Sequence, residues 1–234
     1  MSHLIERAII MAAGQGTRLN PLTQRIPKPL IKVNGTAMID TIVSALHSNG
    51  IFEIYVVVGH LKHEFEHWVK KYRDVHLIEN PWFKECNNIS SLYVAREYLK
   101  NVLIIDGDQI IANKSILSRE FSQSGYCCAW CEGDTKEWLL TLKNGNVSSC
   151  SRYGGTNGWQ LFGVSRWTEA DGKMLRKHVE KQFSELKNSS VYWDDLALFI
   201  YPQMYSLAVY PIKYGDIYEI DNLAELQEMD PSYL

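Results

Sequence analysis

Long apolar runs are missing from this 234-residue sequence, and so is an excess of charge of either sign. No stretch approaches the roughly 20 apolar residues that a membrane-spanning helix needs, and the first eleven residues carry Glu6 and Arg7, unlike a secretory signal. With 24 Lys and Arg against 27 Asp and Glu, general attraction to nucleic acid or an anionic membrane is not expected. We therefore expect a cytoplasmic protein without nucleic-acid or membrane partners, in which any phosphate is held by a local site.

Cysteine is also scarce, with five residues, an odd number. Cys128 and Cys131 have the spacing of metal ligands, but the second pair that a structural zinc site needs is missing. The surrounding residues 126–130 predict a buried strand. We expect reduced core thiols here in preference to a metal or redox site.

Apolar residues make up 46% of the chain and aromatic residues 12%, enough for a full-sized core. The sequence contains no internal repeat, low-complexity tract or linker. We predict a single domain over residues 1–234.

Three short apolar runs in the first half end in glycine or aspartate, which is typical of buried parallel strands. They cover residues 7–12, 54–58 and 101–105, and helical patterns cover residues 37–48, 62–72 and 90–99. This alternation predicts an α/β fold with a doubly wound, mostly parallel, Rossmann-like sheet.

The second half changes character, because strand patterns there are separated by glycine turns at 144–145 and 154–155. The strands are expected at residues 126–131, 138–142, 158–164 and 207–211, with a helical pattern over 168–187. We expect antiparallel additions to the sheet and a small lid or acceptor-binding region.

Ligands of open parallel sheets bind beyond the carboxyl ends of the strands. Gly14, Gly16 and Gly59 fall there, as do Asp106 and Asp108. A glycine turn lets backbone N–H groups approach a phosphate chain. The sequence after Gly16 fits neither the Rossmann nor the Walker pattern, so the turn alone could equally be an ordinary strand-to-loop connection.

Residues 12–23, Ala-Ala-Gly-Gln-Gly-Thr-Arg-Leu-Asn-Pro-Leu-Thr, and the Pro-Lys-Pro-Leu of residues 27–30 resemble the signature of the sugar-nucleotide pyrophosphorylase and cytidylyltransferase superfamily. The resemblance implies that the glycine loop wraps a nucleoside triphosphate and that Arg18 and Lys28 are catalytic cations at the α-phosphorus. It also implies that Asp108 and Asp221 hold Mg²⁺. Asp221 could instead cap the helix that begins near Leu223.

These residue types suit the implied chemistry. When a phosphate oxygen attacks another phosphorus, two anions meet, so the site must supply positive charge and in-line geometry more than proton transfer. Arg18, Lys28 and Mg²⁺ can supply that charge, and Mg²⁺ prefers a few carboxylates together with phosphate oxygens. Asp106 could be a metal ligand, a partner of a ligand or a turn residue.

Within the superfamily, the chain is most similar to bacterial CTP:phosphocholine cytidylyltransferases that serve the decoration of surface glycans. The similarity lies in residues 58–62, 87–92, 105–108, 132–138, 192–194 and 218–221. Pro29, which is often alanine in that family, and residues 154–158 depart from the pattern. The implied reaction joins CTP and phosphocholine to give CDP-choline and pyrophosphate.

A quaternary ammonium cannot donate hydrogen bonds, so proteins hold it with aromatic faces and nearby carboxylates. The segments that match the family supply the candidates Glu132, Trp138, Tyr192, Trp193 and Asp194, with Asp195 as a further possibility. Aromatic residues are more often part of the core than of a cage, although Trp138 is favoured as a cage wall.

The nucleotide is expected to contact a larger set of residues, which are Ala12, Ala13, Gly14, Gly16, Thr17, Gly59, Asn87, Asn88, Ser90 and Asp106. An asparagine can present either edge to a base, so the preference for CTP over UTP comes from the resemblance alone. Asn88 or Ser90 could equally be the N-cap of the following helix.

Three other functions remain open at this point. The acceptor could be 2-aminoethylphosphonate, whose primary ammonium favours carboxylates such as Asp194 over a closed aromatic box. It could be a sugar 1-phosphate, although the second half is short for that class. A catalytically silent nucleotide sensor is disfavoured by the intact Arg18, Lys28, Asp108 and Asp221. The sequence does not indicate an oligomeric state.

Overall fold

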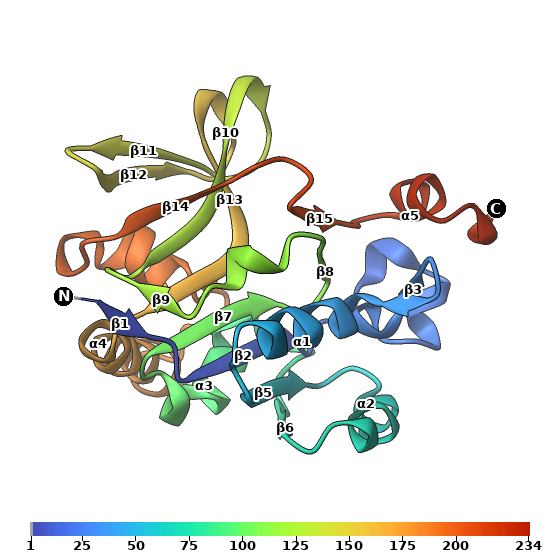
Figure 1. Cartoon of the computed structure of the whole chain (residues 1–234). Coiled ribbons are helices and arrows are strands. Elements are labelled where there is room, and N and C mark those ends of the chain that lie inside the picture. Colours follow the sequence, from blue (N-terminus) through green and yellow to red (C-terminus); the bar gives the residue numbers. More distant parts are fainter. Residues whose placement is uncertain (1) are drawn as a thin grey trace.

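The computed structural model describes residues 2–234, and its centre is a nine-stranded mixed sheet (Figure 1). Four parallel strands form one side of it in the order β7-β2-β5-β6, with β6 at the edge. These strands and the helices between them are β2 (Arg7–Ala12), α1 (Met38–Ser48), β5 (Glu53–Val58), α2 (Lys62–Trp68), β6 (Val75–Glu79), α3 (Ile89–Val94) and β7 (Val102–Asp106). The predicted α/β class with a doubly wound, mostly parallel sheet is confirmed.

Each face of the sheet has its own hydrophobic core, because successive side chains of a strand point to opposite faces. In β2, Ala8 and Ile10 belong to the core that contains Ile42 of α1. Ile9 belongs to the other core, with Leu92 of α3. Helices therefore cover both faces, and the carboxyl edge between them is left for a site.

The second half of the chain extends the sheet with antiparallel strands. β13 (Gly155–Trp167) lies antiparallel to β7, and β10 (Gly125–Thr135) lies antiparallel to β13. The hairpin of β11 (Leu139–Lys143) and β12 (Asn146–Ser151) projects beside them in the upper lobe of Figure 1. β14 (Ala208–Ile212) pairs parallel with β10 and completes this lobe.

Most of the predicted elements are present with shifted ends. Residues 62–72 and 90–99 each form an α-helix followed by a 3₁₀ turn, and residues 168–187 form α4 (Glu169–Val179) followed by a π-helical turn to Glu185. Cys128 and Cys131 are buried in β10, as expected of core thiols. The strands β6 and β12 were not predicted. Nor were the short strands β1 (His3–Leu4), β3 (Lys32–Val33), β4 (Thr36–Ala37), β8 (Gln109–Ile111), β9 (Glu120–Phe121) and β15 (Ile217–Glu219). The final helix is α5 (Leu223–Met229).

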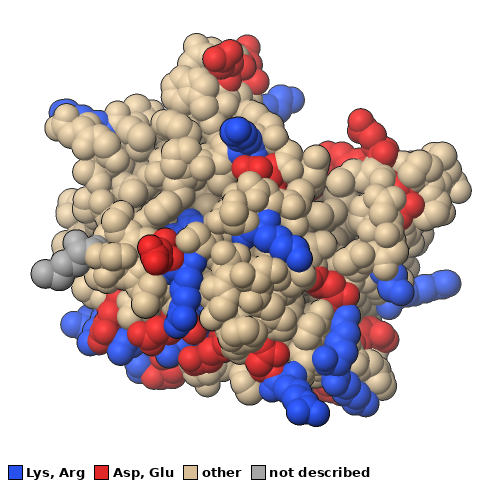
Figure 2. All heavy atoms as spheres, in the orientation of Figure 1, with Lys and Arg blue, Asp and Glu red and all other residues tan. Residues whose placement is uncertain are grey.

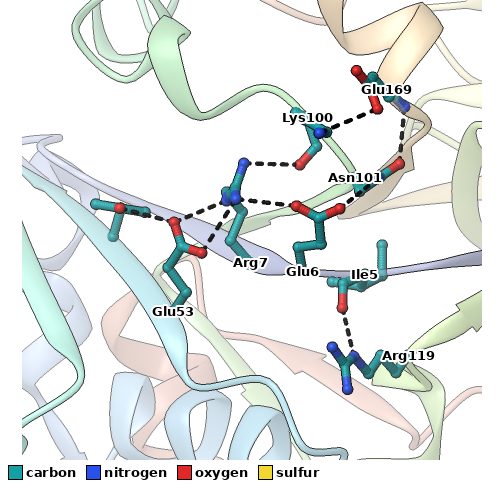
Figure 3. A network of polar contacts seen from close by, with 9 residues as sticks. Ile5, Glu6, Arg7, Glu53, Lys100, Asn101, Arg119 and Glu169 are labelled. Carbon is teal, nitrogen blue, oxygen red and sulfur yellow. Dashed lines mark hydrogen bonds and ion pairs between the residues drawn. The ribbon is translucent and has the colours of Figure 1, made fainter.

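The amino ends of the parallel strands are joined by a polar network around Arg7 (Figure 3). The guanidinium of Arg7 contacts Glu6 at 3.1 Å, Glu53 at 2.9 Å and the backbone oxygen of Lys100 at 3.3 Å. It thereby ties the starts of β2, β5 and β7 together at the end of the sheet opposite the carboxyl ends.

The surface in Figure 2 mixes Lys and Arg with Asp and Glu along its lower part, without a broad patch of one sign on the face shown. Among residues 2–234, no helix is long and apolar enough to cross a membrane.

Candidate active site

A cavity of about 490 Å³ opens at the carboxyl edge of the sheet. It combines the loop after β2 with the ends of β7 and β15. Its lining residues are Met11, Ala12, Gly14, Gly16, Thr17, Arg18, Lys28, Pro29, Asn87, Asp108, Tyr192 and Asp221. The structure therefore brings the predicted glycine loop, both predicted catalytic cations and both predicted metal carboxylates into one place.

Glycine is required at position 16 by both backbone conformation and space. Gly16 has φ of 61° and ψ of 34°, in the left-handed region that other residues rarely adopt. A Cβ at this position would lie 3.0 Å from Cβ of Lys28. The oxygen of Gly16 accepts a hydrogen bond of 2.9 Å from the hydroxyl of Thr23. The turn is thus fixed against the segment that carries Lys28.

Lys28 is buried, with only 6% of its surface exposed, and it sits between two acids. Its Nζ lies 2.7 Å from Oδ2 of Asp108 and 3.1 Å from Oδ1 of Asp221. Burial acts to lower the pKa of Lys28, but the two carboxylates outweigh it and hold that pKa above 10.5. Lys28 is therefore a fixed positive charge.

Arg18 adds a second positive charge, since its Nη2 lies 2.9 Å from the same Oδ1 of Asp221. The Arg18 side chain is 69% exposed, so it can move toward a ligand in the cavity at small cost. The two cations thus differ, one being fixed and the other mobile.

Asp221 does not cap the final helix. The cap of α5 is Asn222, whose side-chain oxygen accepts from the backbone N–H of Glu225 at 3.1 Å. The capping alternative for Asp221 is wrong, and its carboxylate is free to face the cavity.

The donor set of Asp108 and Asp221 fits a Mg²⁺ ion that arrives with a nucleotide. Both carboxylates reach one point, the ammonium of Lys28, so a cation between them is already accommodated. Within residues 2–234, no group of three or more His, Cys, Asp or Glu side chains is placed to hold a metal unaided. Mg²⁺ favours a coordination shell in which two carboxylates are joined by phosphate oxygens and water.

A second cavity, of about 290 Å³, adjoins the glycine loop. Its lining includes the predicted Ala13, Gly14, Gly16, Thr17, Asn87, Asn88 and Ser90, together with Gln15, Asn80, Phe83, Cys86 and Ser91. Asn80 and Phe83 were not predicted, because they follow β6, a strand that the sequence pattern did not reveal. The strand's polar and apolar residues do not form a clear buried run.

The polar residues of this second cavity hold one another in place. Nδ2 of Asn80 donates to the hydroxyl of Ser90 at 2.9 Å, and that hydroxyl donates to the backbone oxygen of Asn87 at 2.8 Å. Oδ1 of Asn88 accepts a hydrogen bond of 2.9 Å from the backbone N–H of Trp193. This side chain therefore contacts residues 192–194, which were predicted to bind the acceptor, and does not cap α3. Gly59 supports the wall, since a Cβ there would lie 2.7 Å from the Phe83 ring.

A third cavity, of about 410 Å³, shares Tyr192 with the first. Its lining residues are Asn88, Asp106, Glu137, Trp138, Arg152, Leu161, Gly163, Tyr192, Asp194 and Glu219. The rings of Trp138 and Tyr192 are nearly perpendicular, at 79°, with centroids 5.8 Å apart. Three predicted acceptor residues, Trp138, Tyr192 and Asp194, therefore meet beside the nucleotide cavity.

Two predicted acceptor residues lie elsewhere, which corrects the expectation for them. Trp193 is 3% exposed and packs on Tyr126 and Trp167 in the core. Glu132 is exposed on β10 and is not part of the described lining of these three cavities. A register irregularity in β10 between Cys131 and Asp134 precedes Glu137, and that carboxylate lines the third cavity.

Asp106 also faces the third cavity and not, as expected, the nucleotide. A Cβ at Gly163 would lie only 2.1 Å from Oδ2 of Asp106, so the adjacent strand must carry glycine there. Burial, followed by the charges of Asp108 and Asp194, raises the pKa of Asp106 well above its usual value.

Two more carboxyls of the third cavity have raised pKa values. Burial raises the pKa of Asp194 to about 7, and the neighbouring Asp195 adds to the rise. Burial likewise raises the pKa of Glu219 to about 7, against the hydrogen bond that its Oε1 accepts from Gln109 at 2.7 Å. A cation that enters this cavity would favour the ionised form of each carboxyl.

The fold and the cavities define a nucleotidyltransferase, and comparison with known families agrees. Residues 8–170 match the family described as the MobA-like NTP transferase domain, and the chain belongs to that family.

Among the relatives that it matches over nearly their whole length are cytidylyltransferases. The chain is 36% identical to a 2-aminoethylphosphonate cytidylyltransferase of Lancefieldella rimae, covering 97% of this chain and 93% of the relative. It is 32% identical to a choline-phosphate cytidylyltransferase of Haemophilus influenzae, covering 96% and 98%. The solved CTP:phosphocholine cytidylyltransferase of Streptococcus pneumoniae superposes with a TM-score of 0.90 at 29% identity, covering 99% of this chain and all of that one.

Proposed function

We propose that this enzyme transfers the cytidylyl group of CTP to phosphocholine and releases CDP-choline and pyrophosphate. The observation that carries the proposal is the junction of the two cavities at Tyr192. One cavity holds paired cations and carboxylates suited to a nucleotide with Mg²⁺, and the other holds an aromatic corner surrounded by carboxylates. A zwitterion with a phosphate at one end and a cationic head at the other fits across that junction.

The nucleotide side supplies positive charge where the reaction needs it. Lys28 is buried and charged next to the glycine loop, and Arg18 can reach the same cavity. Together they stabilise the negative charge that grows at the α-phosphorus as a phosphate oxygen of the acceptor attacks and pyrophosphate leaves. When bound by Asp108 and Asp221 with the triphosphate, Mg²⁺ would supply further charge neutralisation and help to orient the phosphates.

The acceptor side supplies orientation. Trp138 and Tyr192 present aromatic surfaces nearly at right angles, and the carboxyls of Asp106, Asp194 and Glu219 add negative charge around them when a bound cation favours their ionised forms. Cation–π and Coulomb attraction hold a quaternary ammonium, which cannot donate hydrogen bonds. With its head fixed there, the acceptor's phosphate is directed toward the nucleotide cavity, which converts the encounter into an oriented reaction.

A second candidate acceptor is 2-aminoethylphosphonate. Four carboxylates line the acceptor cavity, namely Asp106, Glu137, Asp194 and Glu219, and they can accept the hydrogen bonds of a primary ammonium. The relative from Lancefieldella rimae is named for this acceptor. The same nucleotide chemistry would serve either substrate.

Pyrophosphate release tests the proposal when CTP and UTP are each combined with phosphocholine, 2-aminoethylphosphonate and glucose 1-phosphate in the presence of Mg²⁺. We expect a rate with CTP and phosphocholine. A rate confined to 2-aminoethylphosphonate would keep the reaction and replace the acceptor, and activity with the sugar phosphate alone would contradict the assignment of the third cavity. A cytoplasmic location and a role in decorating cell-surface glycans complete the proposal.

A further inference from the structure

Arg152 is the only cation among the described residues that line the acceptor cavity. It lies in the turn between β12 and β13, within the lobe that covers the cavity. Its side chain is 37% exposed, so it is neither a core residue nor a freely solvated one. A cationic side chain in the cavity proposed for a cationic head group needs a physical reason, because like charges repel.

The guanidinium of Arg152 occupies the aromatic wall itself. Its central carbon lies 5.5 Å from the centroid of the Trp138 ring and 4.1 Å from that of Phe199, both within the range of cation–π attraction. Trp138 is also the ring that meets Tyr192 at the cavity corner. The protein's own cation therefore uses the indole to which a substrate cation would be attracted.

A buried acid holds Arg152 in this position. Its Nη2 lies 2.5 Å from Oδ1 of Asp195, whose side chain is only 5% exposed. The other oxygen of Asp195 accepts a hydrogen bond of 3.0 Å from the backbone N–H of Tyr192. One ion pair thus connects the cation over Trp138 to the backbone of the second aromatic residue.

We propose that Arg152 is a resident cation of the acceptor cavity that competes with the substrate's ammonium group for Trp138 and the surrounding carboxylates, and so determines which cationic head groups bind. This inference rests on the proposed function, because it takes an ammonium to be the group recognised. It assigns Arg152 to specificity, with no part in the transfer step.

The competition affects two kinds of head group unequally. A primary ammonium donates hydrogen bonds to carboxylates and can bind without much use of the indole. A quaternary ammonium depends on the aromatic faces, and it is the larger group, so it has more to gain when the guanidinium is removed. Arg152 therefore weakens the binding of quaternary heads more than that of primary ones, which narrows the preference of the cavity for phosphocholine over 2-aminoethylphosphonate.

Direct binding of tetramethylammonium and ethylammonium tests the proposal without turnover. We would follow the indole N–H signal of Trp138 by NMR at constant ionic strength in wild type, Arg152→Gln and Arg152→Lys. The expected result is that Arg152→Gln lowers the dissociation constant of tetramethylammonium on the order of tenfold, that of ethylammonium less, and that Arg152→Lys stays near wild type.

Two further variants separate specificity from structure. Arg152→Gln leaves the buried Asp195 without its cation, so the double variant Arg152→Gln/Asp195→Asn removes both charges and retains an oxygen for the N–H of Tyr192. Arg96→Gln is the matched control, because that guanidinium lies 4.1 Å from the Tyr93 ring and bonds to Glu180, outside the cavity. It should leave both dissociation constants unchanged.

Unchanged or weaker tetramethylammonium binding in both the single and the double variant would overturn the proposal. An equal gain for both ammonium ions would also overturn it, because general charge removal would then explain the effect. Failure of the proposed function would be seen separately. The wild-type enzyme would then release no pyrophosphate with phosphocholine or 2-aminoethylphosphonate, even if it bound tetramethylammonium and ethylammonium.

Discussion

The ammonium nitrogen of Lys28 lies 2.7 Å from a carboxylate oxygen of Asp108, across 80 residues of sequence. With Asp221 at 3.1 Å on the same nitrogen, the lysine keeps two acids together that would otherwise repel each other. This arrangement prepares a site in which a metal-bound triphosphate meets the two carboxylates and the fixed ammonium together. The nucleotide half of the site is thus preorganised by its own cation.

Replacement of Lys28 by methionine tests this arrangement, since methionine keeps much of the buried stem and removes the charge. We expect kcat to fall at least about a hundredfold, because a preorganised charge at the reacting phosphorus is lost. Pyrophosphate release measures the rate, and circular dichroism should report a folded protein. Wild-type turnover in folded Lys28→Met would remove Lys28 from the mechanism.

Trp138→Ala should raise the Michaelis constant for the amino acceptor on the order of tenfold and leave that for CTP near wild type, because the indole faces only the acceptor cavity. Trp130→Ala is the matched control, since Trp130 is 46% exposed on β10 and packs on Trp159. Equal losses for both substrates in Trp138→Ala would contradict the aromatic corner.

Asp194 makes cation binding depend on pH near neutrality, because burial raises its pKa to about 7. The ionised form attracts the acceptor's head group, so affinity for tetramethylammonium, which has no titrating group, should increase as pH rises from 6 to 8. Asp194→Asn should weaken this dependence and leave the part due to Glu219, whose pKa is also raised to about 7. An affinity independent of pH in the wild type would show that Asp194 is already ionised or does not face the ligand.

The raised pKa of Asp194 has the opposite effect on stability, which falls as pH rises, whereas cation binding strengthens. The unfolded carboxyl ionises near 3.8 and the folded one near 7, so between these values the folded state binds more protons. The contribution of Asp194 to the free energy of unfolding is therefore greatest below pH 3.8 and declines as pH rises toward 7. Denaturant unfolding of wild type and Asp194→Asn across this range would measure the difference.

Gly163→Ala should displace Asp106, because the added Cβ would lie 2.1 Å from a carboxylate oxygen. We expect a loss of about 1–3 kcal/mol in the free energy of unfolding and a raised acceptor Michaelis constant. The double variant Gly163→Ala/Asp106→Ala removes the closest overlaps, with the carboxyl group, but leaves Cβ of residue 106 at 2.8 Å, so it should recover part of the stability and not the acceptor binding. A Gly163→Ala protein as stable as wild type would show that Asp106 can move freely.

The parallel half of the fold and the nucleotide residues could be predicted because they depend on local patterns. Apolar runs that end in glycine or aspartate mark strand ends, and strand ends meet at one edge of a parallel sheet. This placed Gly16 and Asp108 together, and the resemblance of residues 27–30 to the superfamily signature added Lys28. β6 escaped prediction since His76 and Glu79 interrupt its apolar pattern.

The acceptor half was harder to predict because side-chain direction there depends on strand irregularity and long-range packing. Trp193 and Asp194 are neighbours in sequence, yet the first packs in the core and the second lines the cavity. Glu132 and Glu137 lie on opposite sides of the irregularity in β10, which sequence spacing does not reveal. Arg152 lacked any sequence signal, since its role depends on the distant Asp195 and Trp138.

The identity of the product tests whether the cytidylyl group is transferred to phosphocholine. Purified enzyme with Mg²⁺, CTP and phosphocholine would be followed by ³¹P NMR, with Lys28→Met as the inactive control. We expect the phosphocholine signal to be replaced by the paired signals of the CDP-choline diphosphate as pyrophosphate accumulates in equal amount. Release of pyrophosphate with CMP while the phosphocholine signal remains unchanged would contradict it, because the acceptor would then not be the attacking group.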